Sequence, residues 1–313
     1  MDKILPISVL IPTMNRPSSL KRTIASYMSG GYIPSQIIVV DQSQEETIRV
    51  NNEQIVSTYS CETNCCYLYQ SMPSLTKARN YAALYAENEI CIYSDDDVDI
   101  YPDTLKNIYD LMDNGKIALI AGIDDNTPCS KTNIGYILGT KSYFKRKIGH
   151  VTLSVLGRYP DAVKGIVNTE WAMGYFFVIR KSLLKKYNIK WDEKLTSYAY
   201  PEDLDFSYGY CKAAMQDSYK CVLADKVHVK HLASREYRIP SIKSTYMYVI
   251  HRRYLSYKHC MGWKSRVAMN WSDFWMIIKR FMKKENPMDM INAWIFYKRN
   301  ITDIRNGNIE LPV

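Results

Sequence analysis

The chain has 313 residues, a hydrophobic fraction of 47% and a formal net charge of +9. This length suits one large α/β domain with an appendage, and the apolar fraction excludes a disordered chain. No signal peptide and no stretch of about 18 apolar residues is present, so we expect a cytoplasmic protein whose eight cysteines stay reduced.

The first 125 residues alternate strand and helix signals. Short apolar runs predict strands, and the segments between them have helical periodicity. Because this alternation is typical of a mostly parallel sheet flanked by helices, we predict a Rossmann-like α/β fold. In chain order, the expected strands are 7–11, 36–40, 66–69, 90–93 and 117–121, and the expected helices are 18–28, 45–57, 74–86 and 102–112.

The second half of the chain is less regular. We interpret residues 126–170, with the basic run 145–147, as loops and short strands over the sheet edge. A buried strand over 171–180, a short helix to residue 187, a helix from Pro201 and paired short strands over 219–229 are expected next. From about residue 240 the pattern is helical, so we predict a main domain over 1–239 and a basic helical extension over 240–313.

Polar residues follow three of the predicted parallel strands, namely Thr13–Arg16, Asp41 and Asp95–Asp97. In such sheets ligands bind at the carboxyl ends of the strands, so we expect these residues to be neighbours. Three adjacent carboxylates repel one another, and a cation such as Mg²⁺ or Mn²⁺ would neutralise them. A solvated turn with helix-capping aspartates is the alternative for the triplet considered alone.

Four further residues have side chains suited to chemistry. Glu202 and Asp203 begin a predicted helix, where a carboxylate can act as a general base or simply stabilise the helix N-terminus. His231 can ligate a metal or be a structural histidine. Arg79 can bind a diphosphate through two hydrogen bonds or lie on a helix surface.

Taken together, these segments resemble glycosyltransferase family 2, a group of inverting enzymes with the GT-A fold. Residues 7–16 look like the family's first strand and nucleotide loop, and residues 39–43 look like its second strand with a base-binding aspartate. Residues 78–80 resemble the segment that approaches the nucleotide, and Asp95–Asp97 is similar to the D-x-D metal motif. The resemblance covers about residues 5–235.

The resemblance implies metal-dependent transfer of a sugar from a UDP- or dTDP-linked donor to a saccharide or lipid-linked acceptor, as in cell-surface polysaccharide synthesis. It implies Asp203 as the catalytic base, and Asp97 with His231 as ligands of Mn²⁺ or Mg²⁺. Glu202, Trp171 and Gly174 are candidates for the acceptor side. The implied donor-binding residues are Pro12, Thr13, Asn15, Arg16, Asp41, Arg79, Asp95 and Asp96.

Two other functions fit parts of this pattern. A metal-dependent sugar nucleotidyltransferase also uses a doubly wound sheet, but it usually has a glycine-rich loop after the first strand, and Thr13–Arg16 contains no glycine. A non-catalytic nucleotide-sugar-binding protein would keep the fold. The joint presence of Asp97, Asp203 and His231 argues against that function.

The positive charge is concentrated at the C-terminal end, where residues 241–313 hold 13 Lys and Arg but 5 Asp and Glu. In the segment 272–284 a helix would place cations on one face, which is typical of contact with a membrane interface. We therefore expect residues 272–299 to contact the inner face of the cell membrane, with packing on the main domain as the alternative. The aromatic residues are not interleaved with the charges, so no nucleic-acid binding is expected. The expected apolar face consists of Phe274, Trp275, Ile277, Ile278, Phe281 and Met282.

Overall fold

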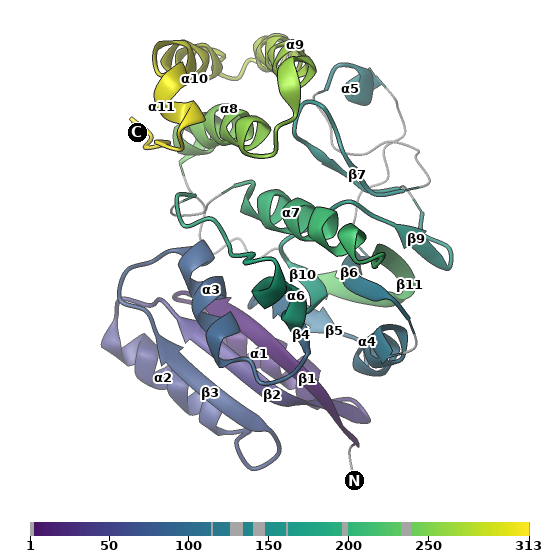
Figure 1. Cartoon of the computed structure of the whole chain (residues 1–313). Coiled ribbons are helices and arrows are strands. Elements are labelled where there is room, and N and C mark those ends of the chain that lie inside the picture. Colours follow the sequence, from purple (N-terminus) through teal and green to yellow (C-terminus); the bar gives the residue numbers. More distant parts are fainter. Residues whose placement is uncertain are drawn as a thin grey trace.

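The computed structural model describes residues 3–113, 115–125, 134–139, 148–160, 162–195, 200–232 and 240–312 (Figure 1). The basic run at 145–147 and the expected boundary at residue 239 lie outside these residues, as does most of the segment 126–147.

A nine-stranded mixed sheet forms the centre of the molecule, in the order β3-β2-β1-β4-β10-β6-β11-β5, with β9 paired to β11. Strands β1, β2, β3 and β4 are parallel, and β10 enters antiparallel between β4 and β6. Helices flank this sheet, so the predicted fold class is confirmed. The strands are β1 Lys3–Thr13, β2 Tyr32–Asp41, β3 Asn64–Tyr69, β4 Ile90–Ser94, β5 Val98–Ile100, β6 Ile117–Asp124, β9 Ile166–Asn168, β10 Phe176–Arg180 and β11 Lys220–His231; a separate hairpin joins β7 His150–Val151 to β8 Gly157–Arg158.

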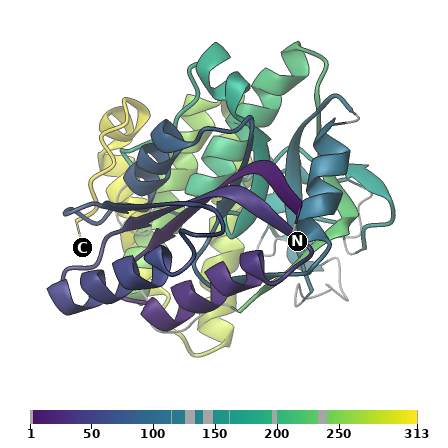
Figure 2. The same cartoon turned by 90° about the horizontal axis from the view of Figure 1, so that it is seen from below.

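Strand β1 contributes side chains to the two hydrophobic clusters that lie on opposite faces of the sheet. Ile7, Val9 and Ile11 pack into the cluster beneath α1 and α4, whereas Leu10 packs into the cluster beneath α3 and α7. Successive side chains of a strand point to opposite faces, so both faces of the sheet are covered. Figure 2 shows α1 and α2 on one side of the sheet and α3 on the other. The helices before the extension are α1 Pro17–Met28, α2 Glu46–Ser57, α3 Leu75–Tyr85, α4 Thr104–Asp113, α5 Ile134–Ile137, α6 Lys181–Lys186 and α7 Glu202–Gln216.

The C-terminal helices α8 Ser241–Lys258, α9 Gly262–Met282, α10 Met288–Arg299 and α11 Ile301–Arg305 lie above α7 (Figure 1). Val249 and Leu255 of α8 and Met269 of α9 belong to the same buried cluster as side chains of α3 and α7, so α8 and α9 pack on the rest of the protein. Ile277, expected on the exposed apolar face, also packs against that cluster. Within the described residues, no helix has both the length and the apolar character needed to cross a membrane.

Two sequence-based element predictions are wrong. The expected paired short strands over 219–229 are one strand, β11, whose register against β6 shifts between Leu223 and His228. The buried strand expected from residue 171 begins only at Phe176, and the preceding residues form a turn that leads to it.

Candidate donor and metal site

Three strand ends meet as expected at one edge of the sheet. Thr13 pairs with Asp41 across β1 and β2, and the amide of Gln42 donates to the carbonyl of Thr13 at 2.9 Å. The hydroxyl of Thr13 donates to Asp96 Oδ2 at 2.6 Å, which joins the end of β1 to the acidic run after β4. Residues far apart in the chain therefore share this edge because the strands are parallel.

Asp96 points into the protein and anchors the acidic run. Its carboxylate accepts hydrogen bonds from Thr13 and, at 3.2 Å, from Arg16, while Thr23 of α1 donates to its backbone carbonyl at 2.8 Å. Burial raises the pKa of Asp96 to about 7, although Arg16 opposes that shift. Asp96 thus lies at the site, with its carboxylate occupied by protein groups.

Asp95, Asp97 and His231 form a group suited to one metal ion. One ligand atom from each residue lies within 4.8 Å of the other two. His231 Nε2 lies 3.3 Å from Asp97 Oδ1, and its ring stacks on Tyr175 with centroids 4.8 Å apart. Two carboxylates and an imidazole at this spacing fit Mn²⁺ or Mg²⁺, with positions left for a phosphate.

The charges around this group support cation binding. Burial raises the pKa of Asp95, and the neighbouring Asp97 adds to the rise while Arg79 opposes it. Burial alone would lower the pKa of His231, but its hydrogen bond to Asp97 and the surrounding carboxylates raise it. The raised pKa of His231 reflects the negative charge of the carboxylates around it, which a divalent cation would neutralise.

Arg79 connects the metal group to helix α7. Its guanidinium is fully buried and donates to Asp95 at 2.9 Å, to Glu202 at 3.2 Å and to the carbonyl of Gly174 at 3.0 Å. It also lies 4.4 Å from the ring centroid of Trp191, a favourable cation–π distance. Arg79 therefore fixes both carboxylates, and its own charge is held inside the protein.

The carboxylates of Asp203 and Glu202 have different hydrogen-bond partners. Glu202 is buried against Arg79, whereas the carboxylate of Asp203 accepts backbone N–H bonds, from Gly174 at 3.0 Å and Leu204 at 2.7 Å. Burial raises the pKa of both carboxyl groups. A carboxylate has about four acceptor positions, so Asp203 keeps capacity to take a proton from a ligand hydroxyl.

Asp41 is completely buried and accepts four hydrogen bonds. Ser43 donates its amide at 2.8 Å and its hydroxyl at 2.5 Å, and Asn52 and Tyr67 donate at 2.9 and 2.8 Å. These four donors use the acceptor positions of both carboxylate oxygens, so Asp41 stabilises the conformation of the loop after β2. A direct contact of Asp41 with a nucleobase remains a prediction.

The remaining predicted residues lie around this centre. Pro12 is buried in β1. Asn15 is exposed and has a positive φ of 58°, and its backbone N–H donates a hydrogen bond to the hydroxyl of Ser43. Trp171 is 5% exposed, and its indole donates to the carbonyl of Arg158 at 3.2 Å. Gly174, in contrast, joins Asp203 and Arg79 through its backbone. The partners Asn52, Tyr67, Tyr175 and Trp191 carried no sequence signal, because each contacts the site from a distant segment.

If Asp203 is the base that the family resemblance implies, Gly174→Ala should impair catalysis without removing any functional side chain. A Cβ at this position would lie 3.0 Å from Asp203 Cβ and 3.3 Å from Arg79 Nη2, so both groups must shift. Small displacements of catalytic groups cost up to about 100-fold in rate, so kcat should fall by about 10- to 100-fold. Steady-state kinetics, with the donor sugar that a screen of nucleotide sugars identifies, measure this. Gly31→Ala is the matched control, because nothing lies within 4 Å of the position that its new Cβ would take, and an unchanged kcat in Gly174→Ala would contradict the role.

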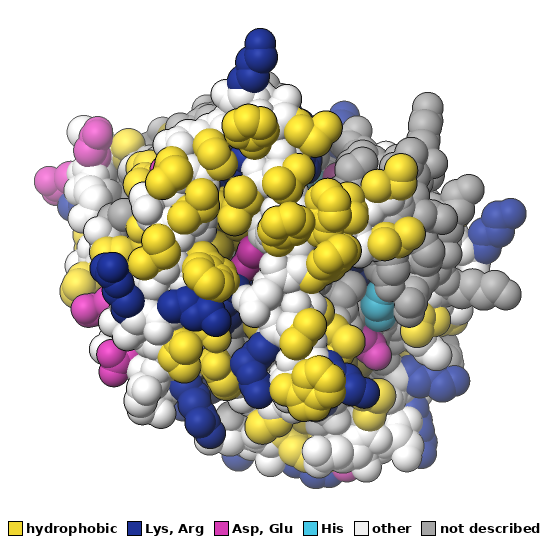
Figure 3. Space-filling model, turned by 90° about the horizontal axis from the view of Figure 1, so that it is seen from above, with side chains coloured by type: hydrophobic (Ala, Val, Ile, Leu, Met, Phe, Trp, Pro, Cys, Tyr) yellow, Lys and Arg dark blue, Asp and Glu magenta, His cyan; other side chains and the backbone are white. Residues whose placement is uncertain are grey.

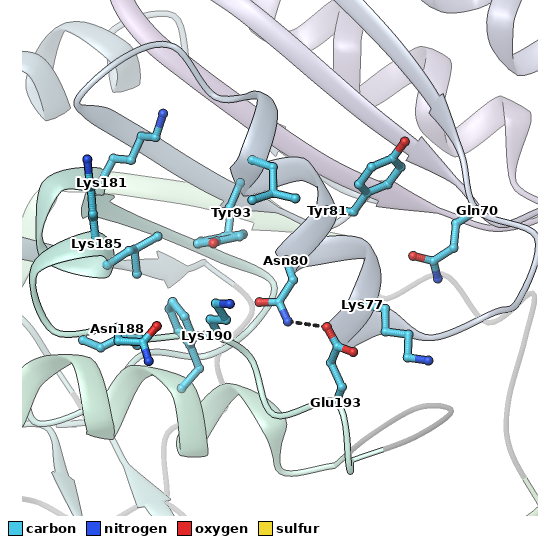
Figure 4. A pocket seen from close by; sticks show the side chains of 15 residues that line it. Gln70, Lys77, Asn80, Tyr81, Tyr93, Lys181, Lys185, Asn188, Lys190 and Glu193 are labelled. Atoms are coloured by element: carbon cyan, nitrogen blue, oxygen red, sulfur yellow. Dashed lines mark hydrogen bonds between the residues drawn. The ribbon is translucent and has the colours of Figure 1, made fainter.

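A separate cavity of about 690 Å³ lies on the flank of α3, beside α6 (Figure 4). Lys77, Lys181, Lys185 and Lys190 line it together with apolar side chains, and Asn80 and Glu193 hydrogen-bond at its edge. Neither the metal group nor Asp203 is among its lining residues, so we assign it no part in the site.

The sheet, the acidic run after β4 and the carboxylate-bearing helix α7 have the arrangement that the resemblance to glycosyltransferase family 2 implies. The family model described as "Glycosyl transferase family 2" matches residues 8–188, which is more than half of the chain. The chain belongs to this family, as its sequence motifs predicted.

Similar solved structures share this fold. The S. aureus TarS 1-349 complex with UDP-GlcNAc is 20% identical, with a TM-score of 0.58 over 94% of this chain and 79% of that chain. GalNAc-T7 with UDP, GalNAc and Mn²⁺ is 14% identical, with a TM-score of 0.56 over 93% of this chain and 56% of that chain. The mannosyltransferase PcManGT from Pyrobaculum calidifontis with GDP-Man and Mn²⁺ is 12% identical, with a TM-score of 0.54 over 96% of this chain and 84% of that chain. The chain covers 42% of the longer TarS structure, and no curated protein sequence matches it.

Proposed function

We propose that this protein is an inverting, metal-dependent glycosyltransferase that takes a sugar from a UDP- or dTDP-linked donor. The observation that carries the proposal is the group Asp95, Asp97 and His231, linked through Arg79 to the helix that bears Asp203. Solved neighbours that contain UDP-GlcNAc, or UDP with Mn²⁺, support this donor class. The acceptor is a saccharide or a lipid-linked saccharide in cell-surface polysaccharide synthesis.

Asp203 carries the acceptor half of the reaction. Its carboxylate removes the proton from the acceptor hydroxyl while that oxygen attacks the anomeric carbon. The new glycosidic bond forms on the face opposite the breaking bond to the diphosphate, so one displacement inverts the configuration. The amides of Gly174 and Leu204 hold the carboxylate in the orientation for this step.

The donor half uses the residues at the strand ends. Asp97, His231 and Asp95 would hold Mn²⁺ or Mg²⁺, which offsets the negative charge that develops on the leaving diphosphate. Arg79 keeps Asp95 oriented, and Arg16 lies 3.8 Å from Asp97. The loops around Thr13 and Asp41 would bind the nucleoside.

We further place the enzyme in the cytoplasm, in peripheral contact with the inner face of the cell membrane, where a lipid-linked acceptor would be found. There are two alternatives to glycosyl transfer: transfer of a nucleotidyl group to a sugar phosphate, and non-catalytic binding of a nucleotide sugar. The first would release inorganic pyrophosphate from a nucleoside triphosphate, and the second would give no turnover.

Calorimetric titration with UDP, dTDP and GDP, each with and without Mn²⁺, tests the donor half. We expect UDP or dTDP to bind, and Mn²⁺ to strengthen that binding, because Asp95, Asp97 and His231 would hold a cation whose charge attracts the diphosphate. Diphosphate binding that does not depend on metal would contradict the proposed site. A screen of nucleotide sugars for release of the nucleoside diphosphate then identifies the sugar, and pyrophosphate release from a nucleoside triphosphate would indicate the alternative chemistry.

A further inference from the structure

Helix α9 has a buried face and, on the opposite side, an exposed apolar face. Ser265, Met269, Ser272 and Asp273 are buried against the rest of the protein. The opposite face, here called the α9 outer face, repeats at intervals of three or four residues, so at 100° per residue it spans an arc of about 80°. It consists of Trp263, Val267, Trp271, Phe274, Ile278 and Phe281.

The α9 outer face is exposed to an unusual degree. Except for Ile278, which is half-buried, its side chains are 48% to 75% exposed. Met282 continues it at the end of α9, and Met288 and Ile295 of α10 are also exposed. Figure 3 looks down on these helices and shows apolar side chains spread across the surface, with lysines and arginines among and beside them. Large contiguous apolar patches of this kind mark sites of protein or membrane contact.

The charges beside the α9 outer face are mostly positive, and the acid that follows them, Glu285, lies 3.9 Å from Lys283. Residues 262–299 contain eight Lys and Arg and three Asp and Glu. The single acid within α9, Asp273, is buried between Arg252 and Arg253 at 3.2 and 2.6 Å. Lys264 comes directly after Trp263, the first of the apolar side chains, and Lys283 and Lys284 follow the last of them. The surface therefore presents cations around aromatic side chains.

These features favour a lipid surface over a protein surface. A second copy of this face would bring cations against cations, which opposes pairing. Tryptophan and phenylalanine insert at the headgroup level of a bilayer, and lysines beside them contact anionic headgroups. We propose that the α9 outer face docks flat onto a bilayer containing anionic phospholipid. This inference rests on the membrane contact proposed above, and it names the surface and the lipid charge.

Docking through α9 would fix the orientation of the catalytic domain. Asp273 ties α9 to α8, and the C-terminal end of α8 is tied to α7 by Lys258 and His259, which contact Asp205 at 2.6 and 2.8 Å. Helix α7 also carries Asp203 at its N-terminus. The lipid contact is thus connected to the helix of the proposed base through the contacts of two buried carboxylates, Asp273 and Asp205.

Vesicle sedimentation of the full chain tests the inference. We expect the protein to bind vesicles of phosphatidylcholine with phosphatidylglycerol, and to bind pure phosphatidylcholine much more weakly. The double variant Trp263→Ser/Phe274→Ser should lose affinity by at least about 10-fold, because both aromatic side chains leave the lipid. Lys283→Glu/Lys284→Glu should lose at least about 5-fold per cation, and high salt should weaken wild-type binding.

The control double variant is Leu84→Ser/Met215→Ser, which changes two exposed apolar side chains outside α9, 77% and 56% exposed. It should bind vesicles like the wild type. Equal binding by Trp263→Ser/Phe274→Ser and wild type would overturn the inference, as would a dimer in sedimentation equilibrium that this variant dissociates. The experiment involves no sugar transfer. A wild-type protein that binds UDP but no vesicles would contradict the lipid surface alone, and one that binds vesicles but no UDP would contradict the donor site alone.

Discussion

Asp203→Asn is expected to lower kcat by about 100- to 10,000-fold, the range that a positioned general base contributes, while the affinity for the nucleoside diphosphate stays unchanged. The amide has almost the same shape as the carboxylate, but it cannot take a proton from the acceptor hydroxyl. The carboxylate of Asp203 is held by the amides of Gly174 and Leu204 and is not part of the metal group, so the donor side should remain intact. Single-turnover transfer rates and calorimetric donor binding, measured on the same preparation, separate the two effects.

Asp217→Asn at the other end of α7 is the matched control for Asp203→Asn, and it should transfer at the wild-type rate. Thermal unfolding of both variants checks that the helix is retained. The pH profile gives a second readout: because burial raises the pKa of Asp203, activity should fall on acidification at a pH above the ordinary titration range of aspartate. Near wild-type transfer by Asp203→Asn would exclude Asp203 as the base, and Glu202→Gln would then be the next variant to measure.

The parallel half of the sheet was predictable because buried parallel strands are continuous apolar runs. Residues 37–40 are an example, since all four side chains are buried. Strand β11 was not predictable, because Asp225 and Lys226 interrupt its apolar pattern in the manner of a turn. In the structure Asp225 instead accepts a hydrogen bond from the amide of Gly165 at 2.6 Å, and the strand continues past an irregular register. A three-residue strand such as β5 is too short to produce a periodic pattern.

The location of the candidate site followed from the rule for strand ends, but the individual roles within it did not. The sequence shows three consecutive aspartates and gives no sign that Asp96 points inward to Thr13 and Arg16 while Asp95 and Asp97 reach His231. Arg79 and Glu202 are separated by 123 residues, so no local pattern could pair them. Periodicity also indicated that α9 is amphipathic, without showing which of its side chains pack on the rest of the protein.

The positively charged side chains near Asp97 and Asp95 indicate which of the two contributes more to metal binding. Asp95 is held by the buried guanidinium of Arg79 at 2.9 Å, whereas Asp97 has the more distant Arg16 at 3.8 Å and the imidazole of His231 at 3.3 Å. A carboxylate already paired with arginine binds a cation less strongly, because the positive charges repel each other. Asp97 should therefore contribute more to metal affinity than Asp95.

Asp97→Ala is accordingly expected to weaken Mn²⁺ binding by at least about 100-fold, because loss of groups that merely support a ligand already costs 10- to 100-fold. UDP binding should then lose its dependence on Mn²⁺. Calorimetry and the paramagnetic resonance signal of free Mn²⁺ measure the affinity without any turnover.

Asp99→Asn is the control for Asp97→Ala, since Asp99 lies two residues away on β5 and pairs with Arg22 at 3.4 Å. It should keep the wild-type Mn²⁺ affinity. His231→Gln should weaken Mn²⁺ in the same direction as Asp97→Ala, and the double variant should lose little more than the worse single variant if both residues hold one ion. An unchanged Mn²⁺ affinity in Asp97→Ala would remove this residue from the metal site and leave Asp95 and His231, with only one carboxylate, as too small a ligand set for a tightly held divalent cation.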